Sequence, residues 1–341
     1  MAVTLAQTFT DNSRKEDVSD IITIIDPTDT PVLANIGEQD IENPDAYEWQ
    51  IDALAGESQA GQEDGFDFDD ITDSVTERTK LVARCQIQAK GVKISERRDQ
   101  NAKYGLDSEL AYQLAKRSEE MKRDCESTIL LRRGPTTSAS GVPPRCAGIP
   151  AWIRSNLSLG GTGGGATPQA PALTGTTPAE PDMTSADDGS VRALDESVFL
   201  DLIGQCYDEG GNPDMIVVPR AVKQLMSQYF FSSNARIATP YQDHGKSPAS
   251  GLQVVGAVDY YVSDFGVLAI VPNRLMPTAE ALILDTSMWE KGTFRGYEMH
   301  EIAKDGDHQK YMLVHDFTLI SRDEAASARF AAIDTSTPML P

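Results

Sequence analysis

Histidines and carboxylates gather near the C-terminal end, the combination best suited to metal or acid/base chemistry: His300, Asp305, Asp307, His308, His315 and Asp316. Imidazole and carboxylate groups together can hold a divalent cation or move protons. The spacing argues against both roles, because His300 opens the run HEIAK instead of H-E-x-x-H and His308 falls in a predicted turn. We therefore expect no catalytic residue and no metal ligand here.

The run EDGFDFDD, residues 63–70, is the second candidate for chemistry. Clustered carboxylates can bind calcium, which prefers hard oxygen ligands. The run lacks the D-x-[DN]-x-[DN]-G pattern and the closing glutamate of a calcium loop. A charged face, either solvated or lying between subunits, is the favoured interpretation.

Neither the cysteines nor the glycines form a recognisable site. The four cysteines, Cys85, Cys125, Cys146 and Cys206, are far apart and include no CxxC pair, so they predict neither a zinc site nor a redox motif. The glycine run at 160–165 has no following GK[ST] and no helix to hold a phosphate. No G-x-S-x-G motif occurs. We expect no cofactor and no enzymatic activity.

The charge balance limits the partners of the chain. Its 341 residues include 30 basic and 52 acidic side chains, a formal charge of −22. Nucleic acid binding usually depends on clustered Lys and Arg, so adhesion to phosphates is not expected. The opening residues do not resemble a signal peptide, and no apolar run approaches 18 residues. We expect a protein made in a reducing cytosol, with no membrane partner.

Residues 105–135 predict one long helix. Apolar residues recur every three or four positions, charged residues cover the opposite face, and Asp107 and Ser108 suit the N-terminal end. Gly134-Pro135 is a stop signal. A single apolar stripe on so long a rod needs an equally long surface to cover it.

The sequence of the first hundred residues predicts two extended elements, an arm and a ribbon, that project from the rest of the chain. Residues 1–36 form an arm in which prolines at 27 and 31 prevent a continuous helix. Residues 38–73 hold thirteen acidic residues and no Lys or Arg, whereas 78–98 is basic and alternates as a strand over 80–95. Together with a strand at 47–51 this predicts a long antiparallel ribbon, which is marginally stable alone and needs a neighbouring surface.

The rest of the chain predicts a linker, an α/β stretch and a hairpin. Residues 155–190 are rich in Gly, Pro, Thr and Ser and predict a flexible loop. Helices are expected at 195–209 and 221–230, with strands at 215–218, 253–255, 259–262, 268–271 and 281–284. Strands at 295–304 and 309–321 predict a closing hairpin.

Five segments, in this order, resemble the major capsid proteins of tailed bacteriophages with the Hong Kong 97-type fold. They are DPTDTPVLANIG (26–37), SELAYQLAKRSEEMKRDCE (108–126), GGNPDMIVVP (210–219), VSDFGVLAIVPNRLM (262–276) and FTLISRDEAAS (317–327). The resemblance implies an α+β fold with an N-terminal arm at 1–36 and an extended loop at 37–97. It further implies a peripheral domain with the long helix as its spine at 98–155 and 286–335, a Gly/Pro-rich insertion loop at 156–195, and an axial domain at 196–285.

The implied function is self-assembly, as hexamers and pentamers, into the icosahedral head that encloses double-stranded phage DNA without sequence-specific binding. The implied partners are copies of the chain, a portal protein, and separate scaffolding and cement proteins. The implied location is the virion, assembled in the host cytoplasm. We hypothesise that acidic residues of the extended loop meet basic residues of a neighbour; the contact candidates are Asp64, Asp67, Asp69, Asp70, Arg78, Arg84, Arg97 and Arg98.

Two features depart from the prototype of the fold. No Lys lies between Lys15 and Lys80, so cross-linking through a lysine of the extended loop is not expected. The chain opens directly with the arm, so scaffolding is expected from another protein. The alternatives are the shell of a non-viral nanocompartment with the same fold and, less favoured, a cytosolic enzyme with an unrecognised site.

Overall fold

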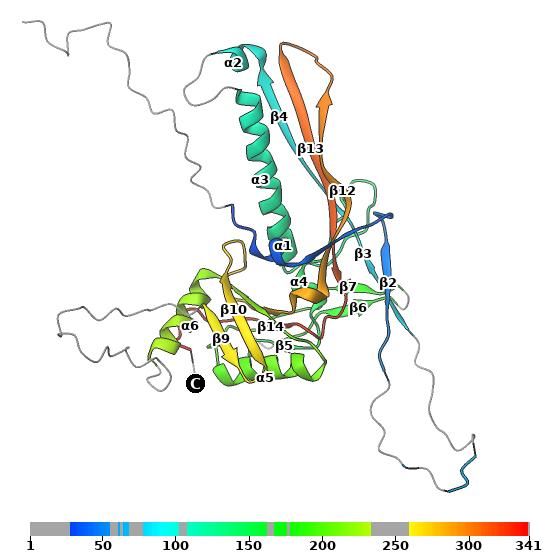
Figure 1. Cartoon of the computed structure of the whole chain (residues 1–341), viewed down its shortest axis with the longest axis vertical. Helices are drawn as coiled ribbons and strands as arrows, with labels where there is room; N and C mark the ends of the chain where they lie inside the picture. Colours follow the sequence, from blue (N-terminus) through cyan, green and yellow to red (C-terminus); the bar gives the residue numbers. More distant parts are fainter. Residues whose placement is uncertain are drawn as a thin grey trace, which may run out of the picture.

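The structure is a computed structural model that describes residues 28–54, 61, 64–67, 78–101, 108–161, 167–175, 178–232 and 259–339, with only the backbone described at 230–232. Helices and sheets are mixed along the chain, which confirms the predicted α+β class. Figure 1 shows two main bodies, a long helix beside a four-stranded sheet and a six-stranded sheet with its own helices, and a two-stranded ribbon that points away from them.

The long helix is α3, Glu109–Leu130. Ser108 is its N-cap, as predicted, and its hydroxyl accepts a hydrogen bond from the N–H of Ala111. The helix ends four residues before the stop signal at Gly134-Pro135. The reason is tertiary: Gly148 packs so closely that a Cβ there would lie 2.0 Å from the carbonyl oxygen of Leu131, and its N–H donates to the carbonyl of Arg133.

A four-stranded sheet lies beside this helix, in the order β1-β12-β13-β4. Strands β12, Trp289–Ile302, and β13, His308–Ser321, form the predicted hairpin, although β12 begins six residues earlier than expected. β4, Gln86–Ser95, pairs with β13 along its whole length. β1, Gly37–Asp40, pairs in parallel with the start of β12. Short helices α1, Pro31–Asn35, and α2, Glu96–Gln100, precede β1 and follow β4.

The predicted strand at 80–95 is divided between two sheets. β3, Thr79–Ala83, pairs with β2, Tyr47–Ile51, to form the ribbon, whereas β4 belongs to the four-stranded sheet. The break falls at Arg84 and Cys85, where the N–H of Cys85 donates to the carbonyl of Pro44 and the hydroxyl of Thr318 donates to the carbonyl of Arg84. The alternating pattern continues through this point, so the sequence alone did not reveal it.

The six-stranded sheet has the order β5-β14-β11-β8-β10-β9. Its strands are Leu157–Ser158 (β5), Met215–Val218 (β8), Tyr260–Ser263 (β9), Gly266–Pro272 (β10), Ala281–Leu284 (β11) and Ala328–Phe330 (β14). Helices α5, Glu196–Asp208, and α6, Arg220–Ser232, pack on this sheet. Their ends lie within one or two residues of the predicted ones. The predicted strand at 253–255 lies outside the described residues.

Hydrophobic packing divides into two clusters that share this sheet. One face of it, with Ile216 and Ile283, packs on α5 and α6, and the other, with Val217 and Leu284, faces the cluster that contains Trp289 and the end of α3. The short helices α4, Ile149–Trp152, and η3, Thr286–Met288, lie at this junction. The sheet therefore joins the two main bodies through a continuous buried layer.

The Gly/Pro-rich stretch has more structure than the predicted flexible loop. Within residues 155–161, 167–175 and 178–190, strands β6, Ala172–Thr174, and β7, Glu180–Asp182, form a hairpin, and further bridges tie Gly161 to Ser190 and Gln169 to Asp187. Gly175 and Gly189 have positive φ, which glycine adopts without strain. The composition predicted a flexible loop, because it gives no sign of the backbone pairing between the two ends of this stretch.

Candidate functional site

The three histidines do not form a common site. His300 pairs with Glu298 at 3.1 Å and His308 with Asp305 at 2.6 Å, both near the end of the hairpin. His315 is fully buried, and its ring is stacked 4.1 Å from that of Tyr297. Burial lowers the pKa of His315 to about 4, so its ring is neutral at pH 7. Within the part of the chain that the structure describes, no three His, Cys, Asp or Glu residues are placed to hold a metal ion.

The four cysteines are buried and unpaired. Burial raises the pKa of Cys85 to about 12, of Cys146 to about 11 and of Cys206 to about 12, and it also raises the pKa of Cys125. The thiolate is the reactive form of cysteine. These thiols therefore stay protonated at neutral pH and are poor nucleophiles.

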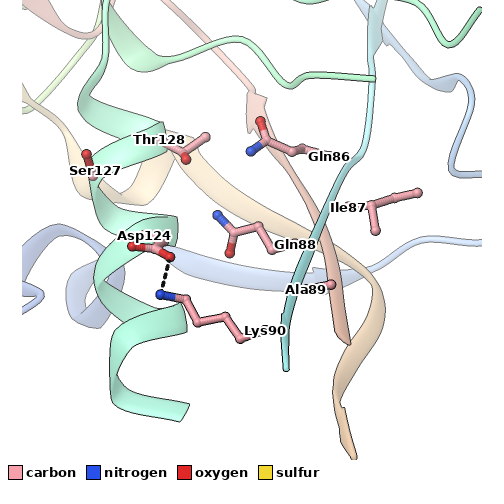
Figure 2. Close-up of a pocket in the computed structure, with 8 residues that line it drawn as sticks. All are labelled: Gln86, Ile87, Gln88, Ala89, Lys90, Asp124, Ser127 and Thr128. Atoms are coloured by element: carbon pink, nitrogen blue, oxygen red, sulfur yellow. Dashed lines mark ion pairs between the residues drawn. The ribbon is translucent and has the colours of Figure 1, made fainter. Parts of the chain in front are cut away.

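A polar notch separates β4 from the C-terminal half of α3 and has a volume of about 440 Å³. Figure 2 shows the side chains of Gln86, Gln88 and Lys90 directed from β4 toward the helix. The ammonium of Lys90 pairs with the carboxylates of Asp124 at 2.7 Å and Glu120 at 3.3 Å, bridging the notch. These contacts fasten the helix to the sheet, and they leave no pair of groups arranged for acid/base catalysis in the notch.

Of the four acidic contact candidates, Asp64 and Asp67 are exposed, and Asp69 and Asp70 lie outside the described residues. The ribbon that leads to them exposes the side chain of Leu54 completely, and Phe66 beside Asp67 is half exposed. Exposed apolar side chains that lie close together often mark a surface that a partner covers. The part of the acidic stretch that the structure describes thus lies at the surface.

The basic candidates differ in their surroundings. Arg78 pairs with Asp52 across the ribbon, and Arg84 pairs with Glu180 at 3.1 Å. Arg97 and Arg98 lie on α2 at the far end of the four-stranded sheet, and both are exposed. Arg98 pairs with Glu109 at 3.0 Å, and no ion pair joins Arg97 to a residue in the described ranges. The structure does not bring these arginines together with Asp64 or Asp67 through any ion pair among the described residues.

Sequence reasoning missed Glu126, a fully buried carboxylate on α3. Its oxygens accept hydrogen bonds from the N–H groups of Val32 and Leu33 and, at 2.6 Å, from the side-chain amide of Asn273. The carboxylate thereby joins the first turn of α1 to the long helix and to the end of β10. Burial raises the pKa of Glu126, while these hydrogen bonds oppose the rise. In sequence it looked like one more charged residue on the polar face.

A second buried network was also missed. The guanidinium of Arg329 on β14 is fully buried and pairs with Glu280 at 2.9 Å and with Asp188 at 2.6 Å. Asp188 also pairs with Arg132, just beyond the end of α3, at 3.1 Å. These charges compensate one another in a low-dielectric setting. The network fastens the Gly/Pro-rich segment to both main bodies.

No helix in the described ranges has the length and apolar character needed to cross a membrane. Residues 3–334 match the sequence model of the family described as SU10 major capsid protein. A relative, the major capsid protein of Escherichia phage Phieco32, is 26% identical, and the alignment covers 95% of this chain and 96% of that protein.

Solved structures share the fold at low sequence identity. The capsid of cyanophage A-1(L) superposes with a TM-score of 0.61 at 12% identity, covering 96% of this chain and 99% of that one. The SrpI encapsulin complex of Synechococcus elongatus PCC 7942 superposes with a TM-score of 0.55 at 10% identity, covering 98% of both chains. The architecture is the Hong Kong 97-type capsid fold, as the five segments predicted.

Proposed function

Because the chain belongs to the SU10 major capsid protein family, we propose that its copies assemble as hexamers and pentamers into an icosahedral phage head that encloses double-stranded DNA. As a major capsid protein it is a component of the virion and associates with itself to form the shell. The observation that carries the proposal is a family match over nearly the whole chain, residues 3–334, on a fold with an outward-pointing ribbon.

Self-association would explain why apolar side chains near the ribbon are exposed in a single copy of the chain. The ribbon strands pack Trp49, Leu81 and Ala83 into the core of their own chain, whereas Leu54 and Phe66, beyond the paired strands, are exposed. Contact with adjacent copies would bury apolar side chains such as Leu54 and Phe66, each Å² contributing about 25 cal/mol. Weak contacts of this kind, repeated under closed symmetry, can form a stable shell.

We assign the domains as the resemblance implies: arm 1–36, extended loop 37–97, peripheral domain 98–155 and 286–335, insertion loop 156–195 and axial domain 196–285. The ribbon β2–β3 is the root of the extended loop, α3 is the spine, and the six-stranded sheet is the centre of the axial domain. The pairing of β4 with β13 is compatible with a peripheral sheet that begins at Gln86, before the proposed boundary at 97.

The inter-subunit charge contact remains part of this proposal. Arg97 is the first choice among the basic candidates, because it is exposed and has no ion pair with the described residues of its own chain, and Arg98 lies beside it. Arg78 and Arg84 already form ion pairs within the chain, so binding a carboxylate of a neighbour instead would break those ion pairs. The acidic partners are those of the extended loop: Asp64, Asp67, Asp69 and Asp70.

The remaining partners follow from the proposed role. A head that is filled with DNA requires a portal protein, and separate scaffolding and cement proteins are compatible with it, with assembly in the host cytoplasm. The charge of −22 suits a lining that does not grip phosphates. We propose no catalytic activity, in keeping with membership of a capsid protein family.

A nanocompartment shell is the second candidate, favoured by the likeness in fold to an encapsulin. At 10% identity this likeness concerns the fold alone, whereas the family match and the phage relative favour the head. Negative-stain microscopy of the purified chain tests self-assembly, and the cargo separates the two shells. We expect closed particles that package DNA when the chain is produced with the other head proteins. Closed particles that instead enclose an enzyme would favour the nanocompartment.

A further inference from the structure

The Gly/Pro-rich segment contacts the ribbon at its root. We call residues 167–175 and 178–190 the strut. The N–H of Val82 on β3 donates to the carbonyl of Ala179 at 2.9 Å, and the N–H of Ala179 donates to the carbonyl of Lys80 at 2.8 Å. Ala179 is 3% exposed and forms a parallel bridge with Leu81. The strut thus adds a third, short strand position to the free edge of the two-stranded ribbon.

An ion pair reinforces this contact where the ribbon meets the body. Glu180, the first residue of β7, pairs with Arg84 at 3.1 Å, and both side chains are largely buried. The Nη1 group of Arg84 also donates to the carbonyl of Asp45 at 2.7 Å, on the other limb of the ribbon. One guanidinium therefore links the strut to both limbs. Figure 1 shows β6 and β7 lying beside the base of β2 and β3.

The opposite end of the strut is fixed to the rest of the molecule. Asp188 pairs with the buried Arg329 and with Arg132, and its carbonyl accepts from the N–H of Gly160 at 2.8 Å. Gly160 lies so close to this end that a Cβ would stand 2.1 Å from the carbonyl oxygen of Ser190. The strut is consequently anchored by buried charges at one end and by the ribbon at the other.

We propose that the strut sets the direction in which the ribbon leaves the body, before any neighbouring copy is present. The root of the ribbon is also packed into the core of its own chain through Trp49, Leu81 and Ala83, so the strut adds to a fixation that spares the conformational entropy of ordering the ribbon during assembly. Fixing the root in advance reduces the cost of association. This inference deepens the proposed function, since a pre-aimed ribbon is useful to a chain whose ribbon contacts another copy.

The experiment is hydrogen–deuterium exchange on the full-length protein as purified, read at the amides of β2 and β3. Ala179→Pro removes the N–H that donates to Lys80, and Glu180→Gln removes the charge that pairs with Arg84. The matched controls are Ala170→Pro, at an exposed strut residue that makes none of these bonds, and Asp201→Asn, at an exposed position on α5.

Exchange at β2 and β3 should be about tenfold faster in Ala179→Pro and Glu180→Gln, with α3 unchanged and both controls at the wild-type rate. If neither variant alters exchange in the ribbon, the strut has no such role. Should the proline variant exchange faster throughout, Glu180→Gln, which keeps the backbone intact, decides the matter. A failure of the wild-type protein to form shells would instead contradict the proposed function. It would not affect the inference that the strut fixes the base of the ribbon.

Discussion

Glu126 on the long helix accepts a hydrogen bond of 2.8 Å from the backbone N–H of Leu33, 93 residues earlier in the chain. Its other oxygen accepts from the N–H of Val32 at 3.0 Å. The N-cap residue of α1, Thr30, makes no side-chain cap hydrogen bond, so this distant carboxylate satisfies two donors at the start of α1. The arm is thereby fixed to the spine at one buried point.

Glu126→Gln should lower the free energy of unfolding by roughly 1–3 kcal/mol, because the amide NH₂ group faces donors and leaves a buried group unsatisfied. Urea unfolding measures the loss, and limited proteolysis near residues 28–36 should become faster. Glu119→Gln, which removes a half-exposed carboxylate of the same helix, is the control and should change little. Equal stability of the two variants would show that Glu126 does not hold the arm.

His315 should make the fold sensitive to acid. Burial, aided by Lys291, lowers its pKa to about 4, while the charges of Asp316 and Glu38 oppose the shift. An unfolded histidine titrates near 6.5. Stability due to the neutral ring is therefore complete above pH 6.5 and is lost as the pH falls from 6.5 toward 4. At about 1.4 kcal/mol per pKa unit, the loss is roughly 3 kcal/mol.

Urea unfolding of the wild type and of His315→Phe between pH 7 and pH 4 checks this prediction. Phenylalanine keeps a ring between Tyr297 and Phe317 but cannot take up a proton. The variant should lose about 3 kcal/mol less than the wild type over this range. Parallel pH profiles for the two proteins would exclude His315 as the source of acid sensitivity.

Arg329→Met should be strongly destabilising, by about 3–5 kcal/mol, because it leaves the buried Glu280 without its cation, while Asp188 keeps only Arg132. The double variant Arg329→Met with Glu280→Gln should recover part of the loss, since one unpaired charge is then removed. Thermal unfolding of the three proteins gives the comparison. A single variant as stable as the wild type would mean that this network is not needed to hold the strut.

Charge reversal on α2 tests the proposed inter-subunit contact. Arg97→Glu with Arg98→Glu should lower the yield of closed particles roughly tenfold or more, since like charges across an interface cost several kcal/mol. Arg220→Glu, at an exposed position at the start of α6, is the control. Normal particle yield and stability in the double variant would count against the contact.

Local sequence patterns predicted the long helices α3, α5 and α6 and the closing hairpin, because their signals lie within each element, whereas the short helices α1, α2 and α4 were not predicted. Ser108 caps α3 as expected, and the strands of the closing hairpin are strongly β-prone. The alternation at residues 80–95 gave no sign of the break at Arg84. Apolar and polar residues continue to alternate through this point, while the partner strand changes from β2 to β13. Such a change of partner depends on the tertiary structure.

The functional residues were harder to predict than the fold. Glu126 and Asp188 are acidic residues in a chain with 52 of them, and only burial distinguishes them from solvated ones. The low-complexity composition of 155–190 predicted a flexible loop, and it concealed the backbone bonds of Ala179. Contacts between segments about a hundred residues apart leave no local pattern in one sequence.

The central claim is that the ribbon and the arm of each copy are covered by identical neighbours. A cryo-electron microscopy reconstruction of particles formed by the purified chain tests it most directly. We predict closed icosahedral shells in which Leu54 and Phe66 of one copy lie against the surface of the next. A small, uniform oligomer in which no neighbouring copy covers Leu54 and Phe66 would contradict the account.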